Sequence, residues 1–175
     1  MSDERRVLNL GSGRRKIPGA VNVDVSSEVG ADLVHDLAVV PWPLQADTFQ
    51  EVHAQDVIEH LSETVQVMEE IHRVCRNGAR AHVTVPHFSS GNAYTDPTHR
   101  RLFGYFSFDY FDETHVFGFY SAARFRRTRA QIVFYPTLLN KLVRRLANRW
   151  PLAYERRWAW IFPAWFLSIE LEVVK

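Results

Sequence analysis

The chain has few of the features that mark secreted or membrane-spanning proteins. One cysteine, Cys75, stands among 175 residues, so no disulfide can form within the chain, and a reducing compartment is expected. No segment approaches the roughly 18 consecutive apolar residues that suggest a spanning helix. The first residues, Met1 to Arg6, contain no apolar run. We therefore expect no signal peptide and a cytoplasmic protein.

A strong overall charge is also lacking, since the net charge is +1. What is present is a hydrophobic fraction of 46% with many aromatic residues, which is enough for a core and predicts one domain over residues 1–175. The charge is uneven, because the segment from Ser121 to Trp160 has ten Arg or Lys residues and one acid, Glu155. Such a segment either attracts an anionic partner or is only the solvated face of a helix.

Short apolar segments of strand length alternate with turn residues in the first half of the chain. They cover residues 6–10, 20–25, 33–35, 49–54 and 81–85. Between the last two, apolar residues recur at helical spacing from Ser62 to Arg76, with Ser62 as the expected N-cap and Asn77-Gly78 as the expected stop. A helix followed by a strand predicts an α/β fold with a mainly parallel sheet.

The second half is less regular. We interpret residues 87–123, which are rich in aromatics, as a cover over an active site, and residues 124–175 as a basic and aromatic C-terminal part of the same domain. Within that part we expect a strand over 129–135, a basic helix over 137–150 and a strand over 167–173. The last strand alternates apolar and polar residues, which is typical of an antiparallel strand near a sheet edge.

Glycines and polar residues follow five predicted strands in succession. They are Gly11-Ser12-Gly13, Asp24, Asp36, Gln55-Asp56 and Pro86-His87. Ligands of parallel α/β sheets bind beyond the carboxyl ends of the strands. Glycine lets the backbone approach a ligand, and carboxylates after the second and third strands can accept hydrogen bonds from a ribose and an adenine. Each feature alone has a plain explanation as a turn or a cap, but together they predict a nucleoside pocket.

Four segments carry a resemblance to a known family. Val7 to Gly13 resembles the first motif of class I S-adenosylmethionine-dependent methyltransferases, and Val23-Asp24-Val25 resembles their ribose-binding strand. The segment from Asp36 to Phe49 and the one from Val57 to Ala79 are similar to the parts that follow. The subgroup is the broad one that includes ubiquinone and menaquinone methyltransferases, and the match spans about Arg6 to Pro86. The resemblance implies a Rossmann-like fold, with S-adenosyl-L-methionine as the cofactor.

The resemblance also implies roles for individual residues. Gly11 to Gly13 would line the methionyl part of the cofactor, Asp24 would hold the ribose, and Asp36 and Leu37 would meet the adenine. Gln55, or its backbone, would hold the amino group of the methionine part. The full set of implied cofactor-binding residues is Asn9, Gly11, Ser12, Gly13, Asp24, Asp36, Leu37, Gln55 and Asp56. By the same comparison, Glu59 and His60 have a structural role at the start of the helix.

Two departures from the family pattern are visible. Asn9 stands where the family often has an acid, so an acceptor remains but the charge is lost. Only ten residues separate Gly13 from Asp24, so the first crossover helix is expected to be truncated to one turn at most, over Arg14 to Ile17. Lys16 occupies the place of the third glycine of a nicotinamide-type fingerprint, which disfavours a redox enzyme.

Methyl transfer to a hydroxyl or a carbon acid requires a base, and three residues are candidates. They are His87, Asp96 and His99. The same three residues could instead bind a divalent metal, or could only cap a turn and satisfy backbone groups; we assign no metal.

The expected acceptor is a small molecule, a glycan or a lipid intermediate, because nothing beyond the catalytic domain is available for docking a macromolecule. Alternatives are an RNA or protein methyltransferase and an inactive scaffold that binds the cofactor. Nucleic acid is not an expected partner, since the fourth strand ends in Gln55-Asp56-Val57-Ile58 and not in a base-methyltransferase motif. Arg144, Arg145 and Arg149 beside a Trp-rich segment predict weak peripheral contact with membranes, unless these aromatics only pack on the sheet. The oligomeric state stays open.

Overall fold

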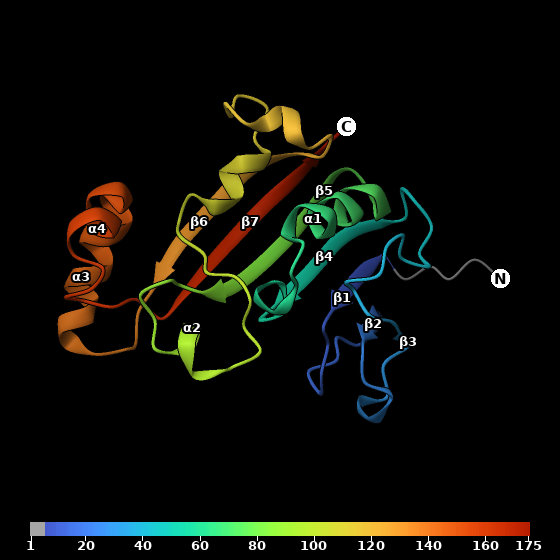
Figure 1. The fold of residues 1–175 in the computed structure, drawn as a ribbon, viewed down its shortest axis with the longest axis horizontal. Helices are drawn as coiled ribbons and strands as arrows, with labels where there is room; N and C mark the ends of the chain where they lie inside the picture. Colours follow the sequence, from blue (N-terminus) through green and yellow to red (C-terminus); the bar gives the residue numbers. More distant parts are fainter. Residues whose placement is uncertain (1–5) are drawn as a thin grey trace.

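The computed structural model describes residues 6–175, and within them seven strands form one sheet in the order β3-β2-β1-β4-β5-β7-β6 (Figure 1). The strands are β1 (Val7–Leu10), β2 (Val21–Asp24), β3 (Leu33–Val34), β4 (Phe49–Gln55), β5 (Cys75–Pro86), β6 (Arg124–Val133) and β7 (Phe166–Val174). β1 to β5 pair in parallel, whereas β7 is antiparallel to both β5 and β6. The predicted mainly parallel sheet with an antiparallel edge is confirmed. The expectation about a signal peptide concerns the first residues, of which 1–5 lie outside the described part.

Four α-helices and four 3-10 turns connect the strands in the described part of the chain. The helices are α1 (Thr64–Val74), α2 (Asn92–Thr95), α3 (Leu138–Arg149) and α4 (Pro151–Arg157), and the 3-10 turns are η1 (Ser27–Val29), η2 (Ile58–His60), η3 (Ser107–Phe111) and η4 (Gly118–Tyr120). The predicted helices over 62–76 and 137–150 are present as α1 and α3. The side chain of Thr137 caps α3 by accepting a hydrogen bond from the backbone of Asn140 at 3.2 Å. Helix α4, which begins at Pro151, was not predicted.

The ends of α1 differ from the prediction. Glu63, not Ser62, precedes the first turn, and it makes no side-chain capping bond. Asn77-Gly78 is not the helix stop, because β5 begins directly at Cys75. Gly78, with φ of 76°, lies where the register shifts from Phe49 opposite Cys75 to Glu51 opposite Arg80. The turn signal therefore marks an irregularity inside a longer strand.

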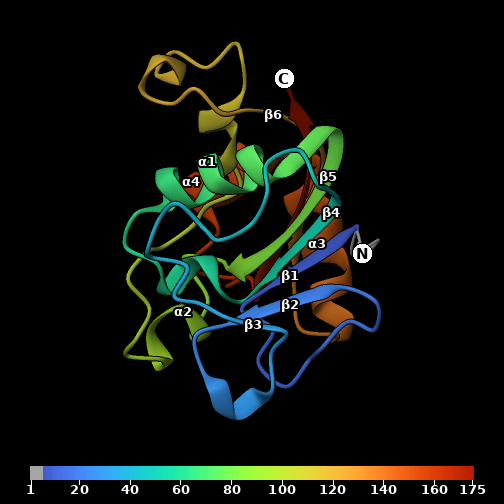
Figure 2. The ribbon, with the colours of Figure 1, turned by 90° about the vertical axis from the view of Figure 1, so that its right-hand side faces the viewer.

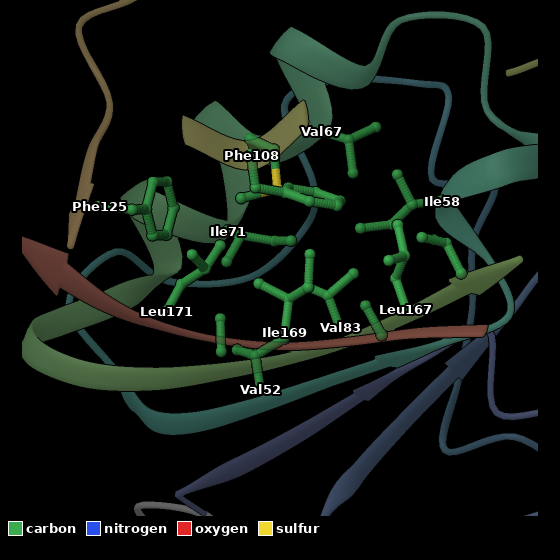
Figure 3. Close-up of a cluster of buried hydrophobic side chains, with 14 of the residues drawn as sticks. Val52, Ile58, Val67, Ile71, Val83, Phe108, Phe125, Leu167, Ile169 and Leu171 are labelled. Atoms are coloured by element: carbon green, nitrogen blue, oxygen red, sulfur yellow. The ribbon is translucent and has the colours of Figure 1, made fainter. Parts of the chain in front are cut away.

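The core lies between α1 and one face of the central strands. Val52 of β4, Val83 of β5 and Ile169 of β7 point toward the helix (Figure 3). Their partners on α1 recur three or four positions apart, which places them on one face. They are Val67, Met68, Ile71 and Val74.

The opposite face of the same strands is polar and half-exposed. Its residues include Glu51 and His53 of β4, His82 of β5, and the ion pairs Arg126–Glu172 (2.7 Å) and Arg129–Glu170 (3.4 Å). The connections that could carry covering helices, residues 11–20, 25–32 and 35–48, contain no α-helix. A sheet with one covered face needs polar side chains on the other, as seen here. Figure 2 shows α1 over one side of the sheet, and Figure 1 shows α3 and α4 beside the end of β6.

The first crossover is as short as predicted, at one helical turn or less. Residues 11–20 form only turns, and the helical turn expected at Arg14 to Ile17 is absent. A buried amide pair takes its place. Nδ2 of Asn9 donates to Oδ1 of Asn22 at 2.9 Å, and this oxygen also accepts from the backbone of Ile17 at 2.9 Å. The crossover is thus held by side-chain amides that satisfy its backbone groups.

Among residues 6–175, no helix is both long enough and apolar enough to cross a membrane.

Candidate functional site

A cavity of about 230 Å³ lies beyond the carboxyl ends of β1, β2, β3 and β4. Five of the residues predicted to bind the cofactor line it together: Gly11, Asp24, Asp36, Leu37 and Asp56. The other lining residues are Val25, His35, Val57, His60 and Leu61, which sequence reasoning did not assign to the pocket. The lining has three carboxylates and no Lys or Arg. Such a lining suits a ligand with a positive charge.

Gly11 is required here for two reasons. Its φ is 58°, a left-handed conformation that other residues rarely adopt. A Cβ atom at this position would also lie 2.4 Å from Cγ2 of Val57. The loop after β1 therefore approaches the segment after β4 more closely than any side chain allows.

Asp24 is held in a fixed orientation by the backbone. One carboxylate oxygen accepts from Gly13 N–H at 2.7 Å, and the other accepts from Ser26 N–H at 2.9 Å. Each oxygen keeps a further lone pair, so the carboxylate can still accept hydrogen bonds from a ligand in the cavity.

The other wall of this cavity comes from the segment after β3. Oδ1 of Asp36 accepts from Ala38 N–H at 2.9 Å. Leu37 is buried, and its carbonyl accepts from the indole of Trp42 at 3.1 Å. Both residues are therefore fixed in place by contacts within the protein.

The four remaining predicted cofactor residues do not line this cavity. Asn9 is buried in the amide pair described above. Ser12 is buried, and its backbone N–H donates to the carbonyl of Val23 at 3.0 Å. Gly13 contacts Asp24 through its backbone. Gln55 is exposed at the end of β4.

A second, larger cavity of about 550 Å³ adjoins the first and shares Asp56 and His60 with it. Its lining comes from the ends of β4 and β5, from the region around α2 and from the start of β7: Asp56, Glu59, His60, Pro86, Asn92, Thr95, Asp96, Pro97, His99 and Phe166. Asp56 stands between the two cavities and forms an ion pair with Arg15 at 3.1 Å. Helix α2 lies beyond the carboxyl end of β5 (Figure 1).

Glu59 is the most unusual group in the larger cavity. Its side chain is 1% exposed, and neither carboxylate oxygen has a hydrogen-bond partner within the structure. Burial raises the pKa of this carboxyl to about 7; the residue's own backbone N–H acts in the opposite direction, and the nearby Asp56 and Asp96 add to the rise. Burying a carboxylate without partners is costly, so this position is hard to explain by folding alone.

Two histidines lie beside Glu59. The Thr98 hydroxyl donates to Asp96 at 2.6 Å, so its oxygen accepts from Nδ1 of His60 at 2.8 Å. Nδ1 of His99 faces the carbonyl of Ala93 at 3.3 Å and must donate to it. In the neutral form, each ring would therefore carry its proton on Nδ1 and keep a lone pair on Nε2. Burial, together with His99, lowers the pKa of His60, which favours its neutral form.

The structure brings Asp96 and His99 to the larger cavity but not His87. That histidine is fully buried. Its Nδ1 accepts from the backbone and hydroxyl of Ser89 at 3.1 and 2.8 Å, and its Nε2 faces Glu155 at 3.2 Å. Both ring nitrogens are occupied within the protein, so His87 fixes the segment after β5 against α4. The three predicted catalytic residues do not form one group.

Part of the segment over 87–123 lines the larger cavity. The backbone N–H groups of Arg100 and Arg101 donate to the carbonyl of Glu59 at 2.8 and 3.2 Å. This contact brings His99 beside His60, with ring centroids 4.7 Å apart. Phe103, Phe108 and Phe111 then enter the core.

The overall arrangement matches solved methyltransferase structures. A SAM-dependent methyltransferase from Archaeoglobus fulgidus aligns with a TM-score of 0.68 and 16% identity, over 96% of this chain and 86% of that one. Phosphoethanolamine N-methyltransferase 2 of Haemonchus contortus, solved with S-adenosyl-L-methionine, gives a TM-score of 0.61 and 13% identity, over 98% of this chain and 49% of that one.

The same fold also occurs in the [4+2]-cyclase SpnF, with a TM-score of 0.60 and 16% identity, over 97% of this chain and 75% of that one. No protein-family model and no curated protein sequence matches the chain. The chain has the fold of class I S-adenosylmethionine-dependent methyltransferases, and at these identities the likeness concerns the fold, while function depends on the site.

Proposed function

We propose that the chain is an enzyme that transfers a methyl group from S-adenosyl-L-methionine to an acceptor in the larger cavity. One observation carries the proposal: residues from four separate strand ends line a single acidic cavity at the place where this fold binds ligands. Gly11 supplies the close approach of the backbone, Asp24 would bind the ribose hydroxyls, and Asp36 with Leu37 would bind the adenine. When bound, the cofactor supplies an activated methyl group on a sulfonium, so the protein mainly positions the acceptor.

The larger cavity suits a small acceptor or the reactive end of a larger one. It joins the cofactor cavity at Asp56 and His60. Glu59, His60 and His99 line it and can take a proton from an acceptor, while Asp96 orients His60 through Thr98. We propose a small-molecule, glycan or lipid-intermediate acceptor. A methyltransferase acting on RNA or protein and an inactive cofactor-binding scaffold are the alternatives that a test must separate.

Calorimetry with S-adenosylhomocysteine tests the first step. We expect micromolar binding by the wild-type chain. Replacing Asp24 with Ala removes a carboxylate that would accept charge-assisted hydrogen bonds, which should cost about 1.5–3 kcal/mol, or roughly 10- to 150-fold in affinity. Glu28→Ala is the matched control, because Glu28 is a nearby acid that is exposed on η1 and does not line the cavity.

The absence of binding by the wild-type chain would exclude the cofactor and the proposed reaction together. Binding without methyl transfer to any small-molecule, lipid, RNA or protein acceptor in a broad panel would favour the scaffold. Transfer only to RNA or protein would replace the proposed acceptor class.

We propose further that α3 and α4 contact anionic membranes, which suits a lipid-linked acceptor. Leu138, Leu139, Leu142 and Leu146 of α3 are all exposed, as are Trp150 and Trp160. The same helices carry Arg144, Arg145, Arg149, Arg156 and Arg157. Exposed apolar side chains beside arginines are typical of helices that lie in a membrane interface. The alternative of packing on the sheet fits Trp165, which stacks on Tyr135 with ring centroids 4.2 Å apart.

Co-sedimentation with vesicles tests this surface. We expect binding to phosphatidylglycerol vesicles at low salt and much weaker binding at high salt or to phosphatidylcholine, because the arginines provide a screened attraction. Leu138→Ser with Leu142→Ser should weaken the binding. Phe119→Ser, which changes an equally exposed apolar residue on η4, should not. Equal and negligible binding to both lipids would remove the membrane contact.

A further inference from the structure

The Glu59 carboxylate is buried without a neutralising or hydrogen-bonding partner in the described part of the chain. A carboxylate at 1% exposure has no hydrogen-bond partner on either oxygen. Two further acids, Asp56 and Asp96, line the same cavity. Hydrogen-bonded partners normally accompany buried charges, unless the charge coordinates a metal. The two groups beside Glu59 are histidines, and both are held in the tautomer that leaves Nε2 free to bind.

The geometry brings these three groups to one point. One carboxylate oxygen of Glu59 and one ring nitrogen each of His60 and His99 lie within 4.8 Å of one another. Ligands about 2.0–2.2 Å from a common ion lie roughly 3–3.5 Å apart, so a bound ion would draw the three atoms closer together. Each histidine also has the outer partner that metal-binding histidines have: Thr98 and Asp96 behind His60, and the Ala93 carbonyl behind His99.

We infer that Glu59, His60 and His99 bind a divalent transition-metal ion, with coordination positions left open toward the larger cavity. Two histidines and one carboxylate are a ligand set of catalytic zinc sites and of other first-row metals. The open positions would take an oxygen of the acceptor, which would make hydroxyl-bearing compounds the substrate class. That last role rests on the proposed function, whereas the metal site itself does not.

A second cluster of similar composition provides the contrast. Glu51, His53 and His82 lie on the polar face of the sheet, again with ligand atoms within 4.8 Å. There Glu51 already contacts Nε2 of His53 at 2.8 Å and Nε2 of His82 at 3.3 Å. All three side chains are half-exposed to water. Here the carboxylate has partners, although Nδ1 of His53 has none among the described residues, so the cluster serves as the matched control.

The test is titration of the metal-stripped full chain with Co²⁺, followed by the visible absorption of the bound ion, and then displacement by Zn²⁺. We expect one ion per chain. Glu59→Gln keeps the shape of the side chain and His99→Ala removes a half-exposed ring, and each should weaken binding by at least about 100-fold. His82→Ala should leave binding unchanged. Circular dichroism of each variant confirms that it is folded.

Each outcome decides the question. Loss of the ion in Glu59→Gln and His99→Ala, with retention in His82→Ala, supports the site. No ion bound to the wild-type chain overturns it, and so does an ion lost only in His82→Ala. S-adenosylhomocysteine binding is measured on the same samples without metal. Cofactor binding without metal binding defeats the metal site alone, and metal binding without cofactor binding defeats the proposed function alone.

Discussion

Glu59 should lower the stability of the metal-free protein, and by an amount that depends on pH. Its pKa is about 7 in the folded chain, against an ordinary value of 4.5. The folded state therefore holds the proton more tightly than the unfolded state. Below pH 4.5 both states are protonated and no penalty exists, whereas above pH 7 both are ionised and the full penalty applies. At 1.36 kcal/mol per pKa unit, the penalty is about 3 kcal/mol.

Replacing Glu59 with Gln removes this titration while keeping the shape of the side chain. The amide needs hydrogen bonds of its own, but that cost is the same at every pH. We therefore expect the free energy of unfolding of Glu59→Gln, relative to wild type, to increase by about 2–3 kcal/mol between pH 5 and pH 8. Urea unfolding followed by tryptophan fluorescence, with EDTA present, measures the difference.

The matched control is Glu63→Gln, since Glu63 is an exposed acid just before α1. Its stability relative to wild type should not change with pH to a comparable extent. If Glu59→Gln gains no more at pH 8 than at pH 5, the carboxylate is not buried without partners, and the reasoning behind both this prediction and the metal site fails.

Two further predictions concern the fold around the site. Gly11→Ala should destabilise the protein by about 2–5 kcal/mol, because the residue has a left-handed conformation and the new methyl group would clash with Val57. Gly13→Ala should cost only about 1–2 kcal/mol, because no other part of the described chain lies within 4 Å of the added Cβ. Equal losses of stability in urea unfolding would contradict the close approach at Gly11. Cys75 is fully buried, and burial raises the pKa of its thiol to about 12. An aromatic disulfide reagent should therefore not modify Cys75 in the folded chain but should react fully in denaturant. Rapid reaction of the folded chain would contradict the burial of Cys75 at the junction of α1 and β5.

The strands and five of the residues that line the smaller cavity could be predicted from the sequence because their signals are local. Each short apolar segment ends at a residue such as Gly11, Asp24 or Asp36 that can act on a ligand. In a parallel sheet these ends meet at one edge whatever the details of the connections. For Gly11, Asp24 and Asp36, the position along the strand was therefore enough to place the residue at the cavity.

The group around Glu59 could not be predicted in the same way, because it depends on contacts between distant segments. Val57-Ile58-Glu59-His60-Leu61 has the appearance of an ordinary helix start. His99 reaches it only because Arg100 and Arg101 donate to the carbonyl of Glu59 about 40 positions earlier. One signal was available in the sequence. Glu59 and His60 follow the end of the same strand as Gln55 and Asp56, so they could have been included among the candidate site residues.

His87 shows the opposite error of sequence reasoning. It directly follows β5, and this position placed it among the candidates for a base. Position at a strand end does not fix the direction of a side chain, and Ser89 with Glu155 turns this one into the core. Glu155 lies 68 residues further along the chain, so no local pattern could indicate the contact.

The truncated first crossover explains how the proposed cofactor cavity can be built without a helix at its base. In dinucleotide folds, the helix after the first strand orients its N-terminal N–H groups and its dipole toward the ligand. Here the Gly13 N–H is directed at Asp24 instead, and the Asn9–Asn22 pair holds the loop in place. The loop therefore orients the carboxylate rather than the ligand itself. Under the proposed function, recognition of the cofactor would depend on Asp24 and Asp36 more than on a helix terminus, which is why Asp24→Ala is the sharpest single test of the cavity.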